Sequence, residues 1–372
     1  MDNRSSKKAR KNKGSRPTAR DVAGLAGVSQ STVSRILSGD TSEFFSEKTR
    51  KRVLKVAAEL GYSPNPIARA LRGKHTHLIG LIIRNISDPF FAELVSEISI
   101  QARELGYQMV LGHAQSEPDQ VLRMSHVLDT RHTDGVVILG DLEDDKRAIQ
   151  DILDGNRALV TMCRGQAQPG ILTVNVDNHA GMQDLLEHVR DLGHSRLAFI
   201  QGGGMGDFQV RRKEFIQFLD DNEFDFDPAW LINETDDCSG GYCAMQQLLG
   251  QPHRPTAVIA ADDLIAMGAL SAALEAGVRV PEEISITGFD GIEMTRYMTP
   301  ALTTVRQPID AMSRIALARL LDLIGGGSVG DQNLILVRPE LVVRHSTGPV
   351  PMMTHSPGGG FADQAIQADQ QV

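Results

Sequence analysis

The sequence predicts an all-α domain at the N-terminus, followed by a larger α/β domain built on parallel sheets. Residues 18–60 contain three short segments with apolar side chains at helical spacing. From Leu78 onward, short apolar strands alternate with amphipathic helices, a pattern typical of parallel sheets that carry helices on both faces. The chain has 372 residues, too many for one ordinary domain, and the part after Leu78 is long enough for two such sheets.

The composition excludes several classes of protein. Hydrophobic residues make up 41% of the chain and charged residues 23%, as in soluble globular proteins. No apolar run approaches the ~18–20 residues that span a bilayer, and no apolar segment follows the basic start, so neither a membrane anchor nor a secretory signal is expected. The 3 cysteines lack metal-ligand or disulfide-framework spacing. We therefore expect a cytoplasmic protein with no membrane association, no metal and no cofactor.

Charge is distributed unevenly along the chain. Residues 1–75 hold 17 Lys and Arg against 6 Asp and Glu, a net charge of +11, whereas the whole chain has a net charge of -9. The remainder is therefore strongly acidic, with a net charge of -20. A basic module on an acidic body is typical of a protein that grips nucleic acid at one end, because phosphate repels the acidic part.

Capping residues and apolar spacing predict the three N-terminal helices. Thr18 and Asp21 form a start similar to a capping box, with Asp in place of Glu. Gly27 ends the first helix and supplies the turn, and Ser29 can cap the second helix, Gln30–Leu37. The third helix covers about Glu47–Leu60. The residues expected inside are Val22, Leu25, Ala26, Val33, Ile36, Leu37, Val53, Val56, Ala57 and Leu60.

A helix, a short turn with glycine and a second helix form the helix-turn-helix pattern. The second helix would enter the major groove of DNA and place its N-terminal side chains against base edges. Its polar face carries Gln30, Ser31, Ser34 and Arg35, and Gln and Arg pair well with adenine and guanine. An ordinary three-helix bundle with a polar face fits the same spacing, but the positive charge favours the DNA-binding interpretation.

Three polar or irregular segments flank these domains. Residues 1–17 contain seven Lys and Arg and are expected to be a disordered basic arm, either a solubilising tail or a phosphate contact. Residues 61–76 form a linker whose helical stretch, 67–71, is too short to be stable alone. The last residues, from about 348 to 372, are rich in Gly, Pro and Gln and are expected to be a disordered tail.

The α/β region divides into recognisable strands and helices. A helix face is expected from Phe91, Leu94, Val95, Ile98, Ala102 and Leu105. Strands are expected at 78–83, 107–112, 135–139, 158–162, 196–201, 256–261 and 284–289, and further helices at 180–192, 209–221, 240–250, 263–276 and 308–324. Ligands of open α/β sheets bind beyond the carboxyl ends of the strands, so two facing lobes would share one cleft.

Six motifs occur in order along the chain: RDVAGLAGVSQSTVSRIL at 20–37, FSEKTRKRVLKVAAELGYSPNPIARALR at 45–72, DPFF at 88–91, ADDLIAMGAL at 261–270, GVRVPEEISITGFD at 277–290 and TPALTTVRQP at 299–308. With these motifs the chain resembles the lac-repressor/purine-repressor (LacI/GalR) family of bacterial transcription regulators over roughly residues 18–345. The stretch from Gly241 to Leu270 is especially similar to purine repressors.

The resemblance implies a helix-turn-helix domain and a two-lobed, periplasmic-binding-protein-like effector domain with two parallel, doubly wound sheets. The protein would be a homodimer or tetramer that binds a near-palindromic DNA operator. It would act as a repressor controlled by a small-molecule effector. The implied divisions are 1–17 (arm), 18–63 (helix-turn-helix), 64–76 (hinge helix and linker), 77–347 (effector-binding and dimerisation) and 348–372 (tail). Lobe one would cover 77–177 and 308–336, and lobe two 178–307 and 337–347.

The resemblance also implies DNA contacts. The family's hinge helix maps to Pro64–Leu71, and Leu71 occupies the position at which the family inserts a leucine into the minor groove. An apolar wedge kinks the duplex at a cost that added contacts offset. The alternative is that Leu71 packs on the body as a linker residue. The implied DNA-contacting residues are Thr18, Ser29, Gln30, Ser31, Thr32, Arg35, Asn65, Ala70 and Leu71.

The family's effector cleft maps onto Phe90, Phe91, Cys163, Arg211, Asp262 and Asp290. Aromatic faces, a guanidinium fork and carboxylate acceptors suit a polyhydroxy ligand, so a sugar, polyol or sugar derivative is expected. Each residue also has an ordinary structural interpretation: Asp262 as a helix cap, the two Phe as core residues and Arg211 as a solvated helix charge.

Several positions depart from the family pattern. Asp262 stands where the family usually has Asn, Cys163 replaces an Asp, and Glu214 replaces a Gly. Met205 and Asp236 occupy the positions of the Arg and aromatic contacts of purine repressors, so a purine effector is not expected. The additional acid in the cleft disfavours an anionic ligand.

No pattern of an enzyme emerges. The glycines of Gly202–Gly206 follow a strand, but they fit neither GxGxxG nor a Walker loop, and a flexible loop at the edge of the cleft is the favoured interpretation. Neither GxSxG nor HExxH occurs, and the histidines are scattered. Two further classes stay open: an effector-independent DNA-binding protein, and a sugar-binding protein whose role on DNA is secondary.

Overall fold

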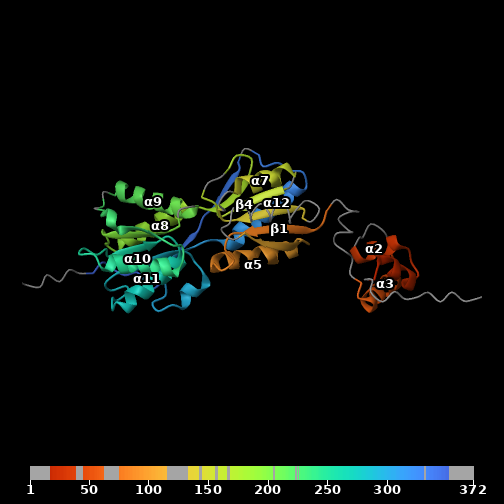
Figure 1. Ribbon diagram of the computed structural model, residues 1–372, viewed down its shortest axis with the longest axis horizontal. Coiled ribbons are helices and arrows are strands. Elements are labelled where there is room, and N and C mark those ends of the chain that lie inside the picture. Colours follow the sequence, from red (N-terminus) through yellow and green to blue (C-terminus); the bar gives the residue numbers. More distant parts are fainter. Residues whose placement is uncertain are drawn as a thin grey trace, which may run out of the picture.

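The computed structural model describes residues 17–38, 45–62, 75–114, 133–141, 145–155, 158–165, 168–203, 206–222, 224, 226–330 and 332–351. Figure 1 shows a small helical headpiece and a body of two lobes. The predictions for the arm, the hinge helix with Asn65, Ala70 and Leu71, Met205 and most of the tail lie outside the described residues.

The headpiece contains the three expected helices, α1 (Ala19–Ala26), α2 (Gln30–Ser38) and α3 (Glu47–Leu60). The Thr18 backbone N–H and hydroxyl both donate to Asp21 Oδ2, at 2.8 and 2.7 Å, so the predicted capping box is confirmed. Gly27 has the left-handed φ of 63° that ends α1, and Ser29 Oγ accepts from the Thr32 N–H at 3.1 Å at the start of α2.

The prediction of the headpiece core is wrong at one residue, Leu25. Leu25 is 67% exposed, whereas Val22, Ala23 and Ala26 are buried. The buried stripe of α1 is centred between Ala23 and Ala26, and Leu25 lies about a quarter turn outside it because successive helical residues rotate by about 100°. The remaining core follows the prediction: Val33, Ile36, Val53 and Ala57 are buried, with Leu37, Val56 and Leu60 packed against them.

Lobe one is a six-stranded parallel sheet with the strand order β11-β5-β4-β3-β1-β2. Helix α12 packs against α5 and against strands β3, β4 and β5. The elements of this lobe are β1 (Leu78–Ile83), α5 (Pro89–Glu104), β2 (Gln108–His113), β3 (Gly135–Leu139), α7 (Asp145–Asp154), β4 (Ala158–Met162), β5 (Leu172–Val176), α12 (Ile309–Ile324) and β11 (Leu334–Val337).

Lobe two is a second six-stranded sheet with the order β12-β10-β9-β8-β6-β7. Strand β12 pairs with β10 in the antiparallel direction, so this sheet is parallel except at its β12 edge. The elements are α8 (Asn178–Asp191), β6 (Leu197–Gly202), α9 (Asp207–Asp221), η1 (Pro228–Trp230), β7 (Leu231–Glu234), α10 (Cys238–Leu249), β8 (Ala257–Ala260), α11 (Asp263–Glu275), β9 (Ser285–Asp290), η2 (Glu293–Tyr297), β10 (Thr303–Arg306) and β12 (Glu340–Val342).

The chain passes between the two sheets three times. It enters lobe two between β5 and α8, returns to lobe one between β10 and α12, and crosses again between β11 and β12. Antiparallel pairing of β12 follows from the third crossing, because the chain enters lobe two from the cleft side, whereas β9 and β10 end at the cleft. The three adjacent crossings join the lobes at one end of the cleft.

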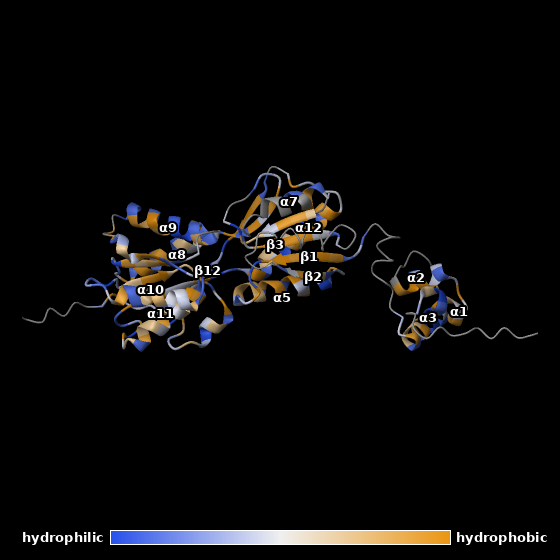
Figure 2. Cartoon of the chain, in the orientation of Figure 1, coloured by the Kyte–Doolittle hydropathy of each residue, from blue (hydrophilic) through white to orange (hydrophobic). Residues whose placement is uncertain are grey.

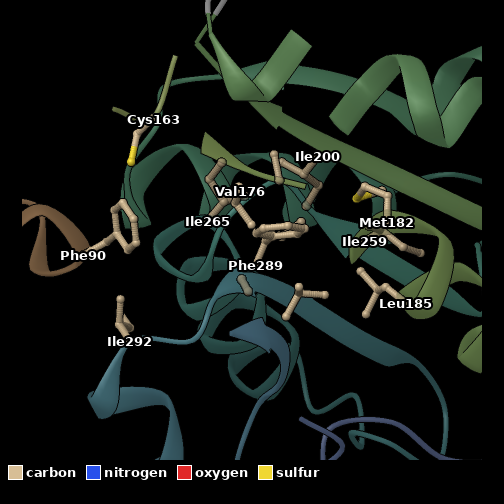
Figure 3. Packing of buried hydrophobic residues seen from close by; sticks show 14 of the residues in the cluster. Phe90, Cys163, Val176, Met182, Leu185, Ile200, Ile259, Ile265, Phe289 and Ile292 are labelled. Carbon is tan, nitrogen blue, oxygen red and sulfur yellow. The ribbon is translucent and has the colours of Figure 1, made fainter. Parts of the chain in front are cut away.

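The core of each lobe lies between its sheet and the helices. Figure 3 shows Phe289 of β9 packed among Met182 and Leu185 of α8 and Ile200 and Ile259 of neighbouring strands. Figure 2 shows apolar strands inside and hydrophilic helix faces outside. Among the described residues, no helix is long and apolar enough to cross a membrane.

The helix face predicted around α5 is correct except at its end. Phe91, Leu94, Ile98 and Ala102 are buried, and Val95 is partly buried. Leu105 is 50% exposed because α5 ends at Glu104 and Leu105 already belongs to the turn.

Glycine permits an unusually close approach of α10 and α11. A Cβ on Gly268 would strike the carbonyl of Cys238, and a Cβ on Gly241 would strike the carbonyl of Ile265. Helix backbones are rigid, so neither contact can be relieved by a rotamer change. The two glycines therefore fix how the helices of lobe two pack.

We expect Gly268→Ala to destabilise the body by about 1–3 kcal/mol, because overpacking forces α10 and α11 apart. Calorimetric melting of the full chain measures the effect. Gly250→Ala is the matched control, since Gly250 has a φ of -76° and its added Cβ would meet nothing closer than 3.5 Å. Equal melting temperatures for the two variants would contradict the packing described here.

Candidate functional site

A cleft with a volume of about 200 Å³, open to solvent, lies between the two lobes. The residues around it follow the carboxyl ends of strands from both sheets, as expected for open α/β sheets. All six residues predicted for the effector site line it. The complete lining is Arg84, Asp88, Phe90, Phe91, Gly140, Asp141 and Cys163 from lobe one, and Gly203, Gly206, Asp207, Phe208, Arg211, Asp236, Asp262, Asp290 and Gln307 from lobe two or its junction.

Arg211 of α9 is a buried cation with a full set of partners. Its Nε donates to Asn178 Oδ1 at 2.9 Å, its Nη1 donates to the Ala261 carbonyl at 2.7 Å, and its Nη2 lies 3.2 Å from Asp290 Oδ1. The guanidinium carbon lies 3.7 Å from the centre of the Phe289 ring. The side chain is only 3% exposed, so the interpretation as a solvated helix charge is wrong.

Asp290 is the acidic partner of Arg211 at the end of β9. Its φ of 107° is unusual for a residue other than glycine, and Gln307 Nε2 donates to its Oδ1 at 2.7 Å. Burial raises the pKa of Asp290 to about 7, although the Arg211 charge acts in the opposite direction. The site therefore holds a carboxyl group that titrates near neutral pH.

Asp262 combines the two predicted roles. It caps α11, with Oδ1 accepting from the Ile265 N–H at 2.7 Å, and it also lines the cleft. Burial raises its pKa well above the ordinary value, and the nearby Asp290 charge raises it further. The helix-cap interpretation and the cleft interpretation of this residue are compatible.

Phe90 and Phe91 begin α5 directly after Pro89. Asp88 caps this helix, with Oδ1 accepting from the Phe90 N–H at 2.9 Å. Both rings are buried, with their centres 5.3 Å apart in an edge-to-face arrangement, and both belong to the hydrophobic core as well as the cleft wall. They form an apolar wall that a ligand can contact without disturbing it.

Cys163 ends β4 with a left-handed φ of 56°. Burial raises the pKa of its thiol well above the ordinary value, so the thiol stays protonated at neutral pH. Cys163 therefore offers the cleft a small apolar surface and not a nucleophile.

Sequence reasoning missed two ion pairs beside the cleft. Arg84 Nη2 lies 2.9 Å from Asp236 Oδ2 and joins the two lobes across the mouth of the cleft. Arg164 Nε lies 3.3 Å from Asp141 Oδ1 within lobe one. Arg84 and Asp141 each follow a buried strand of the sheet, and that position was the only signal that pointed to them.

Asp207 was also missed. Its Oδ1 accepts from Asn175 Nδ2 at 2.9 Å and from Asn178 Nδ2 at 2.8 Å, which connects the end of β5 to the first turn of α9. The negative charge at this helix start disfavours a bound anion there. Gly203 and Gly206 of the glycine loop line the cleft, as predicted for a loop at its edge.

Glu214 lies away from the cleft. Its Oε2 is 2.6 Å from His179 Nδ1, and this pairing raises the pKa of His179. Glu214 therefore connects α9 to α8 through His179 and does not line the cleft.

Within the described part of the chain, the predicted DNA-contacting residues lie at the starts of α1 and α2, except Arg35, which lies in the last turn of α2. Thr18, Ser29, Gln30 and Ser31 are exposed, and Thr32 and Arg35 are partly exposed. Ser29 Oγ lies 2.7 Å from Ser31 Oγ and 2.8 Å from Thr32 Oγ1, so the hydroxyls form one polar cluster. The headpiece presents this cluster and Gln30 together at one helix end.

Comparisons with known proteins match both parts of the chain. The family model of bacterial regulatory proteins, lacI family, matches residues 18–65, and that of the periplasmic binding protein-like domain matches residues 186–347. The HTH-type transcriptional repressor PurR of Klebsiella pneumoniae (strain 342) is 33% identical over 346 residues, which cover 91% of this chain and 99% of that protein.

Two solved structures share the fold. The Lac repressor dimer bound to operator and the anti-inducer ONPF gives a TM-score of 0.79 at 28% identity, covering 90% of this chain and 100% of that one. The complex of the transcriptional regulator CelR with cellobiose gives a TM-score of 0.65 at 29% identity, covering 89% of this chain and 100% of that one.

The pKa of Asp290 predicts a pH dependence of stability. Because its pKa rises from 3.8 to about 7 on folding, the folded state retains a proton that the unfolded state releases, so stability falls as pH rises from about 4 to 7. The loss of folding stability caused by Asp290 over this pH range is on the order of 4 kcal/mol. We expect Asp290→Asn to flatten the dependence of the melting temperature between pH 5 and 8. Asp220→Asn, at an exposed carboxylate of α9, controls for the loss of a charge. Parallel pH profiles of Asp290→Asn and the unsubstituted chain would refute the assignment.

Proposed function

The chain belongs to the LacI family of bacterial regulatory proteins and is a DNA-binding transcriptional regulator, and from this premise we propose that it represses transcription as a homodimer under the control of a carbohydrate effector. The effector would be a sugar, polyol or sugar derivative bound in the interlobe cleft. The observation that carries the proposal is the cleft itself, because aromatic, guanidinium and carboxylate groups from both lobes converge on one space.

The headpiece supports operator binding by a dimer. Gln30 and Ser31 are exposed at the start of α2, where helix-turn-helix proteins contact base edges. A dimer presents two such helices to successive half-sites of a near-palindrome. Residues 64–71 would lie between them at the minor groove. The solved Lac repressor dimer bound to operator supports this arrangement by analogy.

The cleft supports a polyhydroxy ligand more than a purine. Phe90 and Phe91 offer an apolar wall, and carboxylates nearby accept hydrogen bonds from hydroxyl groups. Asp236 is paired with Arg84 and thus places a charge where purine repressors have an aromatic contact. The related CelR complex with cellobiose supports a sugar ligand by analogy.

Control would act through the relative position of the lobes. An effector shifts the equilibrium between two states only through a difference in its affinity for them. Because the cleft draws its lining from both lobes, its shape changes when the lobes move. A ligand that fits one arrangement better would thereby change the dimer and its affinity for DNA.

We expect Arg35→Ala to cost about 1–3 kcal/mol on the specific operator and much less on random duplex, because a base contact is lost. Lys51→Ala, on the exposed face of α3, should weaken both duplexes by similar factors. The operator is first obtained by selecting bound duplexes from a random pool, and gel shifts then measure both affinities. Equal losses on the two duplexes for Arg35→Ala would refute its assigned role.

We expect at least one sugar, polyol or sugar derivative to stabilise the body by about 2.7 kcal/mol at 100 times its dissociation constant. Thermal-shift screening of the full chain detects binding, and gel shifts with the same compounds measure the change in operator affinity. If operator binding is intact and no compound changes either quantity, the protein is an effector-independent DNA-binding protein. If sugars bind and no duplex is preferred over scrambled competitor, its role on DNA is secondary.

A further inference from the structure

The cleft contains more hydrogen-bond acceptors than its cations and amides satisfy. Six aspartates line it. Three of them pair with arginine: Asp236 with Arg84 at 2.9 Å, Asp290 with Arg211 at 3.2 Å and Asp141 with Arg164 at 3.3 Å. Asp207 accepts from two asparagine amides, as described above.

Among the described residues, neither Asp88 nor Asp262 has a cation within ion-pair distance, although Arg84 acts on Asp88 and Arg211 acts on Asp262 from farther away. Each caps a helix, Asp88 accepting from the Phe90 N–H at 2.9 Å and Asp262 from the Ile265 N–H at 2.7 Å. Within the part of the chain that the structure describes, no side-chain cation forms an ion pair with either carboxylate. Two carboxylates from opposite lobes therefore face the cleft with unused acceptor capacity.

A third acceptor, Gln307, points to a ligand independently of the aspartates. This cleft-lining side chain is only 4% exposed, and its Nε2 donates to Asp290 Oδ1 at 2.7 Å. Its Oε1 is buried and has no hydrogen-bond partner among the described residues. An unsatisfied buried carbonyl costs about 1–3 kcal/mol, which a donor on a bound ligand would recover.

The carboxylates are also electrostatically close to one another. Burial is the main cause of the raised pKa of Asp262 and of Asp290, and the charge of Asp88 raises both further, although the Arg211 charge acts in the opposite direction. The charge of Asp290 also raises the pKa of Asp262. Asp88 belongs to lobe one and the other two to lobe two, so like charges oppose one another across the cleft. A positive charge placed among them would relieve this repulsion.

Resting on the proposed function, we propose that the effector carries a protonated amine, as an amino sugar does, and that its ammonium group binds among Asp88, Asp262 and Asp290. An ammonium group offers three donors and no acceptor, which matches an acceptor-rich site. A hydroxyl group offers a single donor, and the Arg211 N–H groups that could donate to its oxygen already point at Asn178, the Ala261 carbonyl and Asp290. The same ammonium group would join the two lobes.

The test compares matched sugars on the full chain at pH 7 and constant ionic strength. D-glucosamine, D-galactosamine and D-mannosamine are each titrated beside the parent hexose and the N-acetyl derivative, using calorimetry and thermal shift. We expect at least one amine to bind about tenfold or more tightly than both of its neutral counterparts, because a charge-assisted hydrogen bond replaces a neutral one. Neutral counterparts that bind as well, or three amines that all fail to bind, overturn the proposal.

A pair of variants separates charge from structure. Asp262→Asn keeps a side-chain oxygen for the α11 cap but removes the charge, so amine affinity should fall about tenfold or more while the affinity for the neutral counterpart changes little. Asp237→Asn is the matched control, because Asp237 caps α10 by accepting from the Gly240 N–H at 2.8 Å and does not line the cleft. Unchanged amine affinity in Asp262→Asn overturns the proposal.

The outcomes also separate this proposal from the proposed function. A neutral sugar that binds the cleft and changes operator affinity preserves a carbohydrate-controlled regulator and excludes the amine. Loss of sequence-specific DNA binding would contradict the regulator itself, whatever the cleft binds. Gel shifts on the selected operator, run with Asp237→Asn as the reference variant, make this distinction.

Discussion

The buried Arg211 guanidinium is the interaction on which the geometry of lobe two depends. A buried cation without partners would be prohibitively costly, so the groups around it are held where they can satisfy it. Its partners come from separate points in the chain: Asn178 at the start of α8, the Ala261 carbonyl after β8 and Asp290 at the end of β9. One side chain therefore aligns the strand ends that form half of the cleft wall.

The sequence predicted the elements whose signals are local. Capping residues and glycine turns marked α1 to α3, and long apolar runs marked β1, β3 and β4. It missed β5, with the sequence LTVNV, because Thr and Asn interrupt the apolar pattern although every residue of this strand is buried. It also missed the edge strands β7, β11 and β12, since short and partly exposed strands have little pattern to detect.

The residues of the cleft could be predicted only in part, because only some of them lie in local sequence motifs. Phe90, Arg211 and Asp290 lie in motifs whose order along the chain marks the family, so resemblance located them. The Arg84 to Asp236 pair joins residues 152 positions apart, and the unpaired Gln307 carbonyl depends on what packs around it. Neither feature has a signature in a single sequence, because both depend on residues that only the folded chain brings together.

The ion pair that joins the lobes across the mouth of the cleft is more exposed than the ion pair within lobe two. The Arg211 to Asp290 pair has side-chain exposures of 3% and 12%, whereas Arg84 and Asp236 are 26% and 32% exposed. Exposed pairs contribute little and are screened by salt, but breaking a buried pair is strongly destabilising. Lobe two therefore supplies a rigid wall, whereas the ion pair across the mouth of the cleft is weak, so a ligand bound there can displace this pair without disturbing the fold.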